Sequence, residues 1–395
     1  MENLTLPNDL VVTCGRGAAP MLEAELRELG CTARPLEETA FMVRGTLVDA
    51  MRLNLWLRSA QRVLLPLASF RANTADDLYR GLADQPWEEL LHPDGYFSIT
   101  TGVDMPAIRD PRFAGLRAKD AIADRMVKAC GKRPDSGGDR NRTVFHLHWF
   151  EGHATFYLDT SGEPLSRRGY RLQSGPAPMQ EALAAACILA SPWRGGGGAF
   201  VNPMCGSGTL AIEAALIARN RAPGLLRKNF GFMHVKPYRE EEWKALRRDA
   251  LAKERPRPGP QLIATDISPR AIEAARANAE RAQVAEDISF GVCDFAETPV
   301  PPAPGVVMLN PEYGERMGDA AALEPEYRRI GDFLKQKCIG YLGYIFTANL
   351  PLAKRVGLHS KRRLILYNAN LEARLLEYEL YAGTRDPGDG GGKET

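Results

Sequence analysis

The stretch of residues 306–319, VVMLNPEYGERMGD, places four unusual residues directly after an apolar strand. A buried strand normally ends in a small turn residue or a helix cap. Here it ends in a side-chain amide, a rigid proline, a carboxylate and a phenol ring: Asn310, Pro311, Glu312 and Tyr313. A few placed polar groups beside an aromatic ring are typical of ligand sites, so these residue types predict a functional site.

Three other predicted strands are also followed by residues that can bind a ligand. VNPMCGSGTLAIEAAL is a strand, a glycine turn and a helix in succession, and Gly206 and Gly208 let a ligand approach the main chain. The next two strands end in Asp266, a position that typically binds a ribose diol, and Asp294. Because the carboxyl ends of parallel strands share one sheet edge, we expect these groups to meet Asn310 there. The alternative is a set of independent loop residues.

The elements that must position these groups follow two patterns. From about residue 176, apolar strands alternate with helices, which predicts a parallel sheet covered on both faces. The last segment, LEARLLEYELY, is expected to return antiparallel along an edge of that sheet. Residues 1–70 have the order βαββαβ, which is ferredoxin-like. The Gly-rich end, residues 385–395, is predicted to be disordered.

Composition limits the class of protein. A chain of 395 residues is long for one domain, and a hydrophobic fraction of 44% is ordinary for a globular protein. A net charge of +2 leaves nucleic-acid affinity to local patches, although such patches are also common on solvated faces. Seven scattered cysteines, the lack of a leader-like start and the lack of a long apolar run favour a reduced, cytoplasmic protein without membrane contact.

Several motifs resemble those of a known family. NPMCGSGT, ATDIS, CDF and NPEYGER resemble, in this order, the motifs of Rossmann-like, S-adenosylmethionine-dependent amino-methyltransferases. LDTSGEPLSRRGYR, APGLLRKNFGF and LYNANLEARLLEYEL look like the THUMP-domain guanine-N2 methyltransferases of 23S ribosomal RNA, the RlmL type, often labelled N6-adenine-specific DNA methylases. The resemblance covers about residues 8–384. It implies an α/β fold with a ferredoxin-like domain (1–70), a THUMP RNA-binding domain (71–160) and a Rossmann-like class I methyltransferase domain (161–384).

The resemblance also implies a cofactor site for S-adenosylmethionine, without metal. Its methionine end would be lined by Asn202, Pro203, Cys205, Gly206, Ser207, Gly208 and Thr209, with Met179 and Gln180 closing over it. The ribose would be held by Asp266, and the adenine by Asp294 and Phe295, with Ile267 and Asn310 also in the site. Asn202 stands where the family commonly has Asp, and Glu312 where it usually has a second proline.

Transfer of a methyl group to guanine N2, which the resemblance implies, would explain the four residues after the strand. Guanine N2 is a poor nucleophile because its lone pair is delocalised into the ring. The Asn310 amide oxygen and the Pro311 carbonyl would hold its N–H groups and turn the lone pair toward the methyl group, while Tyr313 stacks on a flipped base. Glu312 has three open interpretations: it points away, it accepts a proton or binds a guanine N–H, or it marks a weakened enzyme.

Ribosomal RNA is expected to contact basic residues in two segments. The helix FAGLRAKDAIADRMVKAC is expected to place four cations on or near one exposed face: Arg117, Lys119, Arg125 and Lys128. The linker SRRGYR is predicted to meet phosphate through Arg167, Arg168 and Arg171.

The stretch HLHWFEGH offers a weaker signal. His146 and His148 share a strand face, but no carboxylate or cysteine accompanies them at ligand spacing, so no metal site is predicted. Trp149 and Phe150 are predicted to lie in the core or to face RNA.

Two other functions remain open. An Asn-Pro-x-Tyr motif also serves methylation of adenine N6 in RNA or DNA. A non-catalytic RNA-binding or ribosome-assembly factor would also retain the cofactor fold. The expected partner is 23S ribosomal RNA or a pre-ribosomal particle, bound by a monomer.

Overall fold

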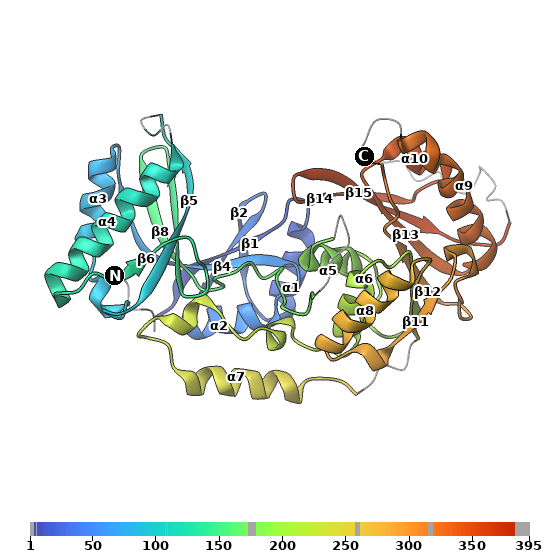
Figure 1. The fold of residues 1–395 in the computed structure, drawn as a ribbon, viewed down its shortest axis with the longest axis horizontal. Coiled ribbons are helices and arrows are strands. Elements are labelled where there is room, and N and C mark those ends of the chain that lie inside the picture. Colours follow the sequence, from blue (N-terminus) through green and yellow to red (C-terminus); the bar gives the residue numbers. More distant parts are fainter. Residues whose placement is uncertain are drawn as a thin grey trace. The chain divides into compact units, whose positions relative to one another are not determined.

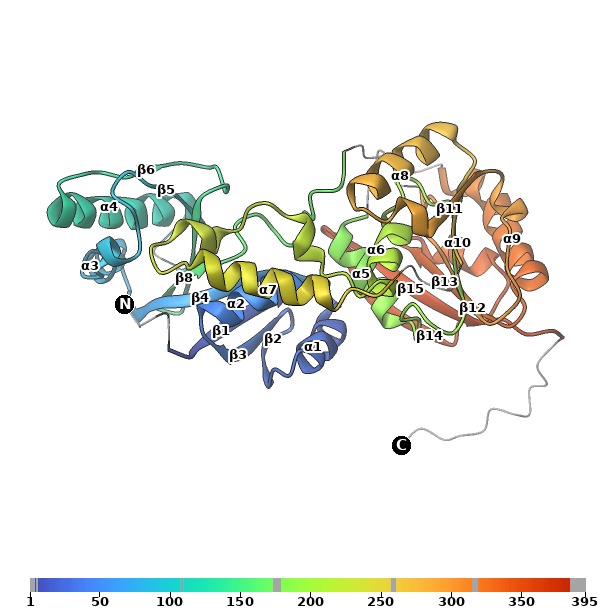
Figure 2. The ribbon, with the colours of Figure 1, turned by 90° about the horizontal axis from the view of Figure 1, so that it is seen from below.

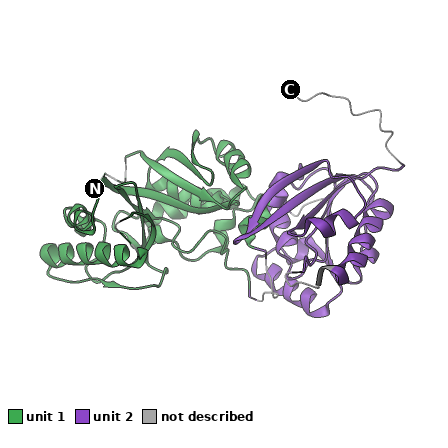
Figure 3. Cartoon of the chain, turned by 90° about the horizontal axis from the view of Figure 1, so that it is seen from above, with its two compact units in different colours: residues 1–171, 180–186, 220–255 green, residues 172–179, 187–219, 256–395 purple. Residues whose placement is uncertain are grey.

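The computed structural model describes residue 4 and residues 6–106, 108, 110–172, 179–256, 261–314 and 319–383, without the side chains of residues 319 and 320. The chain divides into two compact units (Figure 3). The first comprises residues 1–171, 180–186 and 220–255, and the second residues 172–179, 187–219 and 256–395. The segment predicted to be disordered, residues 385–395, lies outside the described residues.

The first unit is built on an eight-stranded sheet in the order β2-β3-β1-β4-β8-β7-β5-β6 (Figure 1). Its strands are β1 (Asn8–Cys14), β2 (Ala33–Glu37), β3 (Ala40–Gly45), β4 (Ala60–Arg71), β5 (Tyr96–Asp104), β6 (Asp135–Ser136), β7 (Thr143–Phe150) and β8 (His153–Asp159). Its helices are α1 (Ala19–Glu28), α2 (Leu47–Trp56), α3 (Ala75–Ala83), α4 (Pro111–Cys130) and α7 (Glu240–Ala252). The order from β1 to β4 is βαββαβ, which confirms the ferredoxin-like prediction.

Local sequence explains where the helices of this unit begin. Thr46 and Thr74 form capping boxes with the acidic residues three positions later, which start α2 and α3. Pro111 follows the N-cap Asp110 and starts α4, and Gly131 ends that helix with a φ of 71°. α3 and α4 lie side by side, and α4 also contacts β5 (Figures 1 and 2). β4 pairs with both β1 and β8, so one sheet runs through the unit.

Residues 220–255 pack within the first unit. A Cβ added at Gly224 would lie 2.6 Å from the Cα of Leu55 on α2, so this contact requires glycine. The guanidinium of Arg227 donates to the carbonyls of Ser161 and Pro164 at 2.9 Å, and its burial lowers its pKa to about 10. The predicted boundaries place this segment in the third domain. The division near residues 70, 160 and 384 stays a prediction.

The second unit contains a seven-stranded sheet in the order β11-β10-β9-β12-β13-β15-β14. Its strands are β9 (Ala199–Pro203), β10 (Leu262–Asp266), β11 (Ile288–Val292), β12 (Gly305–Leu309), β13 (Tyr341–Thr347), β14 (Arg362–Asn368) and β15 (Leu371–Glu379). Its helices are α6 (Thr209–Ala218), α8 (Pro269–Arg281), α9 (Asp319–Lys337) and α10 (Leu350–Arg355), and α5 (Glu181–Ala190) contributes residues to both units.

The parallel sheet predicted for this unit is confirmed from β11 to β13. The edge position predicted for LEARLLEYELY is wrong. β15 is antiparallel, but it pairs with both β13 and β14 and so lies inside the sheet. A strand that closes a hairpin with β14 and then pairs with β13 can insert between them, which its own sequence does not reveal.

Both faces of this sheet are covered. Val201, Val307 and Ile345 pack in one core with Tyr327 and Phe333 of α9. α6 and α8 lie side by side and contact β10 (Figure 2). This explains why the central strands are apolar almost throughout. Among the described helices, none is long and apolar enough to cross a bilayer.

Candidate active site

The predicted residues of the second unit gather at the carboxyl edge of its sheet. β9 pairs with β10 on one side and with β12 on the other, so the strand order reverses there. Such a switch point is where open α/β sheets bind ligands. Asn202, at the end of β9, is fully buried and donates from Nδ2 to the Met308 carbonyl of β12 at 2.9 Å. This bond links the ends of β9 and β12, so the loops that follow these two strands start from fixed positions.

The turn after β9 needs glycine at two positions. Gly206 and Gly208 have φ values of 53° and 82°, in the left-handed region. A Cβ at Gly208 would lie 2.9 Å from the Cβ of Ala275 on α8. The turn leads into α6 at Thr209, and the first N–H groups of a helix have no partner within it. This geometry suits a ligand that approaches the main chain.

Asn278 on α8 fixes the turn, and sequence analysis missed it. It is 1% exposed, donates from Nδ2 to the Ser207 carbonyl at 3.0 Å and accepts from the Leu172 amide at 2.9 Å. An asparagine at helical spacing from the buried Ala274 and Ala275 was the available signal.

Asp266 joins two parts of the edge. Its Oδ2 accepts from the Gly206 amide at 2.9 Å and its Oδ1 from the Ser268 amide at 3.0 Å. The next residue, Ile267, is 71% exposed, which leaves a large apolar side chain beside the carboxylate. The combination suits a ligand with a polar and an apolar part.

Pro203 and Cys205 support the turn from inside. Pro203 is buried at the end of β9, and the Cys205 amide donates to the Thr265 carbonyl at 2.9 Å. Burial, together with the charge of Asp266, raises the pKa of the Cys205 thiol. The thiol therefore stays protonated and is not a nucleophile.

The loop after β11 carries a charged pair. Asp294 accepts from the Ala296 amide at 2.9 Å and from Arg329 of α9 at 2.7 Å. The bond from Arg329 lowers the pKa of Asp294, which keeps this carboxylate ionised. The same guanidinium lies 4.9 Å from the ring centroid of Phe295. Sequence analysis found Asp294 and Phe295 but not Arg329.

The loop after β12 presents an oxygen without a partner. The Oδ1 of Asn310 is buried and has no hydrogen-bond partner among the described residues, and the same holds for the Oδ1 of Asn202. Leaving such an acceptor unpaired costs roughly 1–3 kcal/mol, so each oxygen suits a ligand that donates an N–H or O–H. Pro311 is buried, Tyr313 is half-buried and Glu312 is exposed.

Two side chains that sequence analysis missed hold this loop. The buried Tyr327 hydroxyl of α9 donates to the Glu312 carbonyl at 3.1 Å. Asn349, after β13, donates from Nδ2 to the Tyr313 carbonyl at 3.1 Å. No local motif marks either residue, because both reach the loop from elements that lie later in the chain.

The exposed carboxylate of Glu312 acts on a neighbour. Burial, and then the negative charge of Glu312, raise the pKa of Glu326 on α9. The carboxyl groups of Glu312 and Glu326 therefore both lie near this loop.

The two residues predicted to close over the cofactor are only partly described. Met179 is buried, while Gln180 accepts from Nε2 of Gln61 at 3.3 Å within the first unit. Residues 173–178, directly before them, lie outside the described chain. A cofactor role for Met179 and Gln180 stays a prediction.

The four cations of α4 do not share one face, so that prediction is wrong. A residue two positions along a helix is turned by about 200°, which separates Lys119 from Arg117. Arg117 pairs with Asp76 at 2.8 Å, and Arg125 pairs with Glu88. Lys128 is exposed and Lys119 is half-buried.

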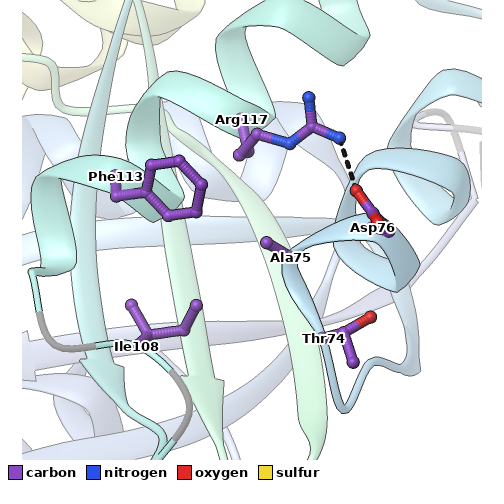
Figure 4. Close-up of a pocket in the computed structure, with 6 residues that line it drawn as sticks. All are labelled: Thr74, Ala75, Asp76, Ile108, Phe113 and Arg117. Carbon is purple, nitrogen blue, oxygen red and sulfur yellow. Dashed lines mark hydrogen bonds and ion pairs between the residues drawn. The ribbon is translucent and has the colours of Figure 1, made fainter.

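A pocket of about 520 Å³ lies between the start of α3 and α4 (Figure 4). Arg117 and its partner Asp76 lie on one side of it, and the half-exposed ring of Phe113 lies on another. The pocket therefore combines an ion pair with apolar surface.

The linker prediction is wrong for Arg168. This residue is 1% exposed, and its guanidinium donates to the carbonyls of Leu165 and Arg58. It stabilises the first unit and does not reach solvent. Arg171 pairs with Glu181 at 3.2 Å. Arg167 is exposed and pairs with Glu163 at 2.6 Å.

The aromatic stretch of β7 divides between core and surface. Trp149 is fully buried and donates from Nε1 to the Ala72 carbonyl, while Phe150 is 36% exposed and stacks on His148 at 4.2 Å. Burial lowers the pKa of His146 to about 4, so this ring is neutral near pH 7. Within the described chain, no three His, Cys, Asp or Glu side chains are grouped to hold a metal.

The fold and the site define a class of protein. A glycine turn, a carboxylate after the second strand and an Asn-Pro-x-Tyr loop meet at the switch point of a Rossmann-like sheet, where a nucleotide-like ligand binds. Residues 168–377 match the RMKL-like methyltransferase domain, residues 9–64 the RlmL ferredoxin-like domain and residues 72–159 the THUMP domain. The chain belongs to the RMKL-like methyltransferase family, which confirms the resemblance seen in the sequence.

Individual relatives agree with this assignment. The chain is 37% identical over 385 residues to the ribosomal RNA large subunit methyltransferase K/L of Syntrophotalea carbinolica, and 36% identical to that of Methylococcus capsulatus. The alignments cover 95% of this chain but 54% and 52% of those proteins, so the chain spans about half the length of these relatives.

Two solved structures match over nearly all of the chain. SMU.472, assigned as a methyltransferase and crystallised with SAH, has a TM-score of 0.85 at 26% identity, with 96% of this chain and 100% of that chain covered. A Listeria monocytogenes protein described as a predicted N6-adenine-specific DNA methylase also has a TM-score of 0.85, at 30% identity, with 96% and 99% covered.

Proposed function

We propose that this chain transfers a methyl group from S-adenosylmethionine to the exocyclic N2 amine of a guanine in 23S ribosomal RNA. The observation that carries this proposal is the buried Oδ1 of Asn310, which has no partner in the described part of the chain and lies next to Pro311 at the switch point of the sheet. The family membership and the ribosomal RNA methyltransferases among the relatives support it.

The residues of the edge fit the cofactor. The fit rests on the Oδ1 of Asn202, for which the described residues provide no partner, on the glycine turn and on the exposed Ile267 beside Asp266. Asp266 has oxygen lone pairs left for a ribose diol, and the ionised Asp294 can accept from the adenine amine. When bound, the cofactor supplies an electrophilic methyl group. Its SAH form accompanies the similar protein SMU.472.

The protein's own share of the chemistry is alignment. Asn310 Oδ1 and the Pro311 carbonyl accept the two N–H groups of the amine, which turns the nitrogen lone pair toward the methyl group. Proline fixes the direction of that carbonyl. Tyr313 stacks on the base, which contributes roughly 1–3 kcal/mol. Alignment of the reacting groups is the larger effect, about 7–11 kcal/mol in well-oriented reactions.

We further propose that the first unit binds the RNA, because its THUMP match lies there and Lys128 is exposed on it. The proposed domains are residues 1–70, 71–160 and 161–384. The site of action is the cytoplasm, where ribosomal RNA is assembled into particles.

Nucleoside mass spectrometry tests this function. Unmodified 23S ribosomal RNA, treated with the protein and S-adenosylmethionine, should contain new N2-methylguanosine. Appearance of N6-methyladenosine instead would support the chemistry described for the Listeria monocytogenes relative. The absence of any product, despite bound cofactor, would favour a non-catalytic RNA-binding factor.

A further inference from the structure

We infer that Tyr327 and Asn349 are positioning residues that hold the loop of residues 310–313 in its working shape. The inference rests on the proposed function and names two residues that act through the loop. It follows from two hydrogen bonds to successive carbonyls, those of Glu312 and Tyr313.

Tyr327 provides the first bond from inside the protein. It is fully buried on α9, and its hydroxyl lies 3.1 Å from the Glu312 carbonyl and 3.1 Å from Thr347 Oγ1. Burial raises the pKa of Tyr327, so the hydroxyl keeps its proton and remains a donor. Its ring packs in the core with Val307 and Ile345. The hydroxyl is therefore fixed by the packing of the whole side chain.

Asn349 provides the second bond and is itself held at two points. Its Nδ2 donates to the Tyr313 carbonyl at 3.1 Å, while its Oδ1 caps α10 by accepting from the Leu352 amide at 3.0 Å. Its backbone amide donates to Thr347 Oγ1 at 3.1 Å. Thr347 is fully buried at the end of β13 and thus links Asn349 to Tyr327 in one network.

The network determines which oxygens of the loop are free to meet a substrate. The carbonyls of Glu312 and Tyr313 are engaged by protein donors, whereas Asn310 Oδ1 has no partner among the residues that the structure describes. With both later carbonyls fixed, the backbone around Pro311 is constrained on its C-terminal side. Loss of either bond should leave the acceptors present but poorly aligned with the amine.

Two conservative variants remove the donors alone. Tyr327→Phe deletes only the hydroxyl. Asn349→Asp keeps an oxygen to cap α10, since Asp and Asn are equivalent N-caps, but it cannot donate to the Tyr313 carbonyl. Tyr341→Phe is the matched control. Tyr341 lies on β13, is 2% exposed and donates to the Pro301 carbonyl at 2.8 Å, away from the loop.

Two measurements on the full chain separate the inference from the proposed function. The first is amide hydrogen exchange in a peptide that contains residues 310–314, which needs no substrate. It should accelerate about fivefold or more in Tyr327→Phe and Asn349→Asp and stay unchanged in Tyr341→Phe, because local opening sets exchange rates. The second is kcat on unmodified 23S ribosomal RNA. It should fall about tenfold in both test variants, with KM and S-adenosylmethionine affinity within twofold, because misalignment acts on the transition state.

The results of these two measurements decide whether Tyr327 and Asn349 hold the loop. Unchanged exchange in the test variants, or a fall in kcat no larger than that of Tyr341→Phe, overturns the inference. A rise in KM with unchanged kcat also overturns it, since that pattern means lost substrate binding. If the wild-type protein forms no product, the proposed function fails, and the exchange measurement alone decides whether the two residues hold the loop.

Discussion

The predicted binding residues of the two units differ in how their polar atoms are paired. In the first unit, arginines expected to bind RNA are engaged within the fold: Arg125 pairs with Glu88, and Arg168 donates to buried carbonyls. At the sheet edge of the second unit, Asn202 and Asn310 each keep a buried oxygen without a partner in the described chain. Since buried polar groups are normally paired, an unpaired one is a stronger sign of a ligand site than a cluster of charge.

The largest effect is expected when the side-chain amide of Asn310 is removed from the loop after β12. Asn310→Ala should lower the single-turnover methylation rate by roughly 100-fold or more, because its bond matters most in the transition state. Cofactor affinity, measured by calorimetry, should survive. Asn368→Ala, on the edge strand β14 of the same sheet, is the control and should leave the rate unchanged. Full activity in Asn310→Ala would exclude the proposed alignment.

The next largest effect is expected on cofactor binding at the carboxyl edge of the sheet in the second unit. Asp266→Ala should weaken S-adenosylmethionine binding by about 1–3 kcal/mol, the cost of losing hydrogen bonds to a charged group. Calorimetry measures it, with Glu273→Ala as a matched carboxylate on the exposed side of α8. Equal affinity in both variants would remove Asp266 from the site.

A smaller effect tests the first unit by comparing two cations of α4. Lys128→Ala should weaken binding to 23S ribosomal RNA a few-fold and reduce the slope of log K against log salt by about one unit, as for one lost phosphate contact. Arg125→Ala should instead leave the slope unchanged, because this guanidinium is paired with Glu88. Fluorescence anisotropy at several salt concentrations measures both. A larger change in slope for Arg125→Ala would contradict the assignment.

The smallest effect is a change in Tm with pH, which follows from the raised pKa of Glu326. A carboxyl whose pKa is raised on folding stabilises the fold below its unfolded pKa, and this stabilisation is lost as pH rises through the folded value. Glu326→Gln should therefore match wild type in Tm near pH 4 and exceed it near pH 7.5. Glu273→Gln, which removes an exposed carboxylate of α8, is the control for the loss of one charge. A lower Tm for Glu326→Gln at pH 7.5 would mean that its charge is stabilising.

The sequence predicted the parts of the site that follow strands. Asp266, Asp294 and Asn310 were found because each closes an apolar run, and parallel strands bring such ends together. Tyr327 and Asn349 were missed because their partners are backbone carbonyls far along the chain, for which no side-chain pattern exists. Arg125 of α4 and Arg168 of the linker were misjudged for a related reason. Whether an arginine faces solvent or a carbonyl depends on tertiary packing, which local charge does not show.

The contribution of residues 220–255 to the first unit has a consequence for synthesis on the ribosome. Arg227 and α7 complete the first unit, yet β9 and α6 of the second unit precede them in the chain. A nascent chain that has been synthesised only as far as residue 171 therefore lacks part of its own first unit. The first unit can fold completely only after residues 187–219 of the second unit, which include the glycine turn, have been synthesised. Its final stability is therefore reached late in translation.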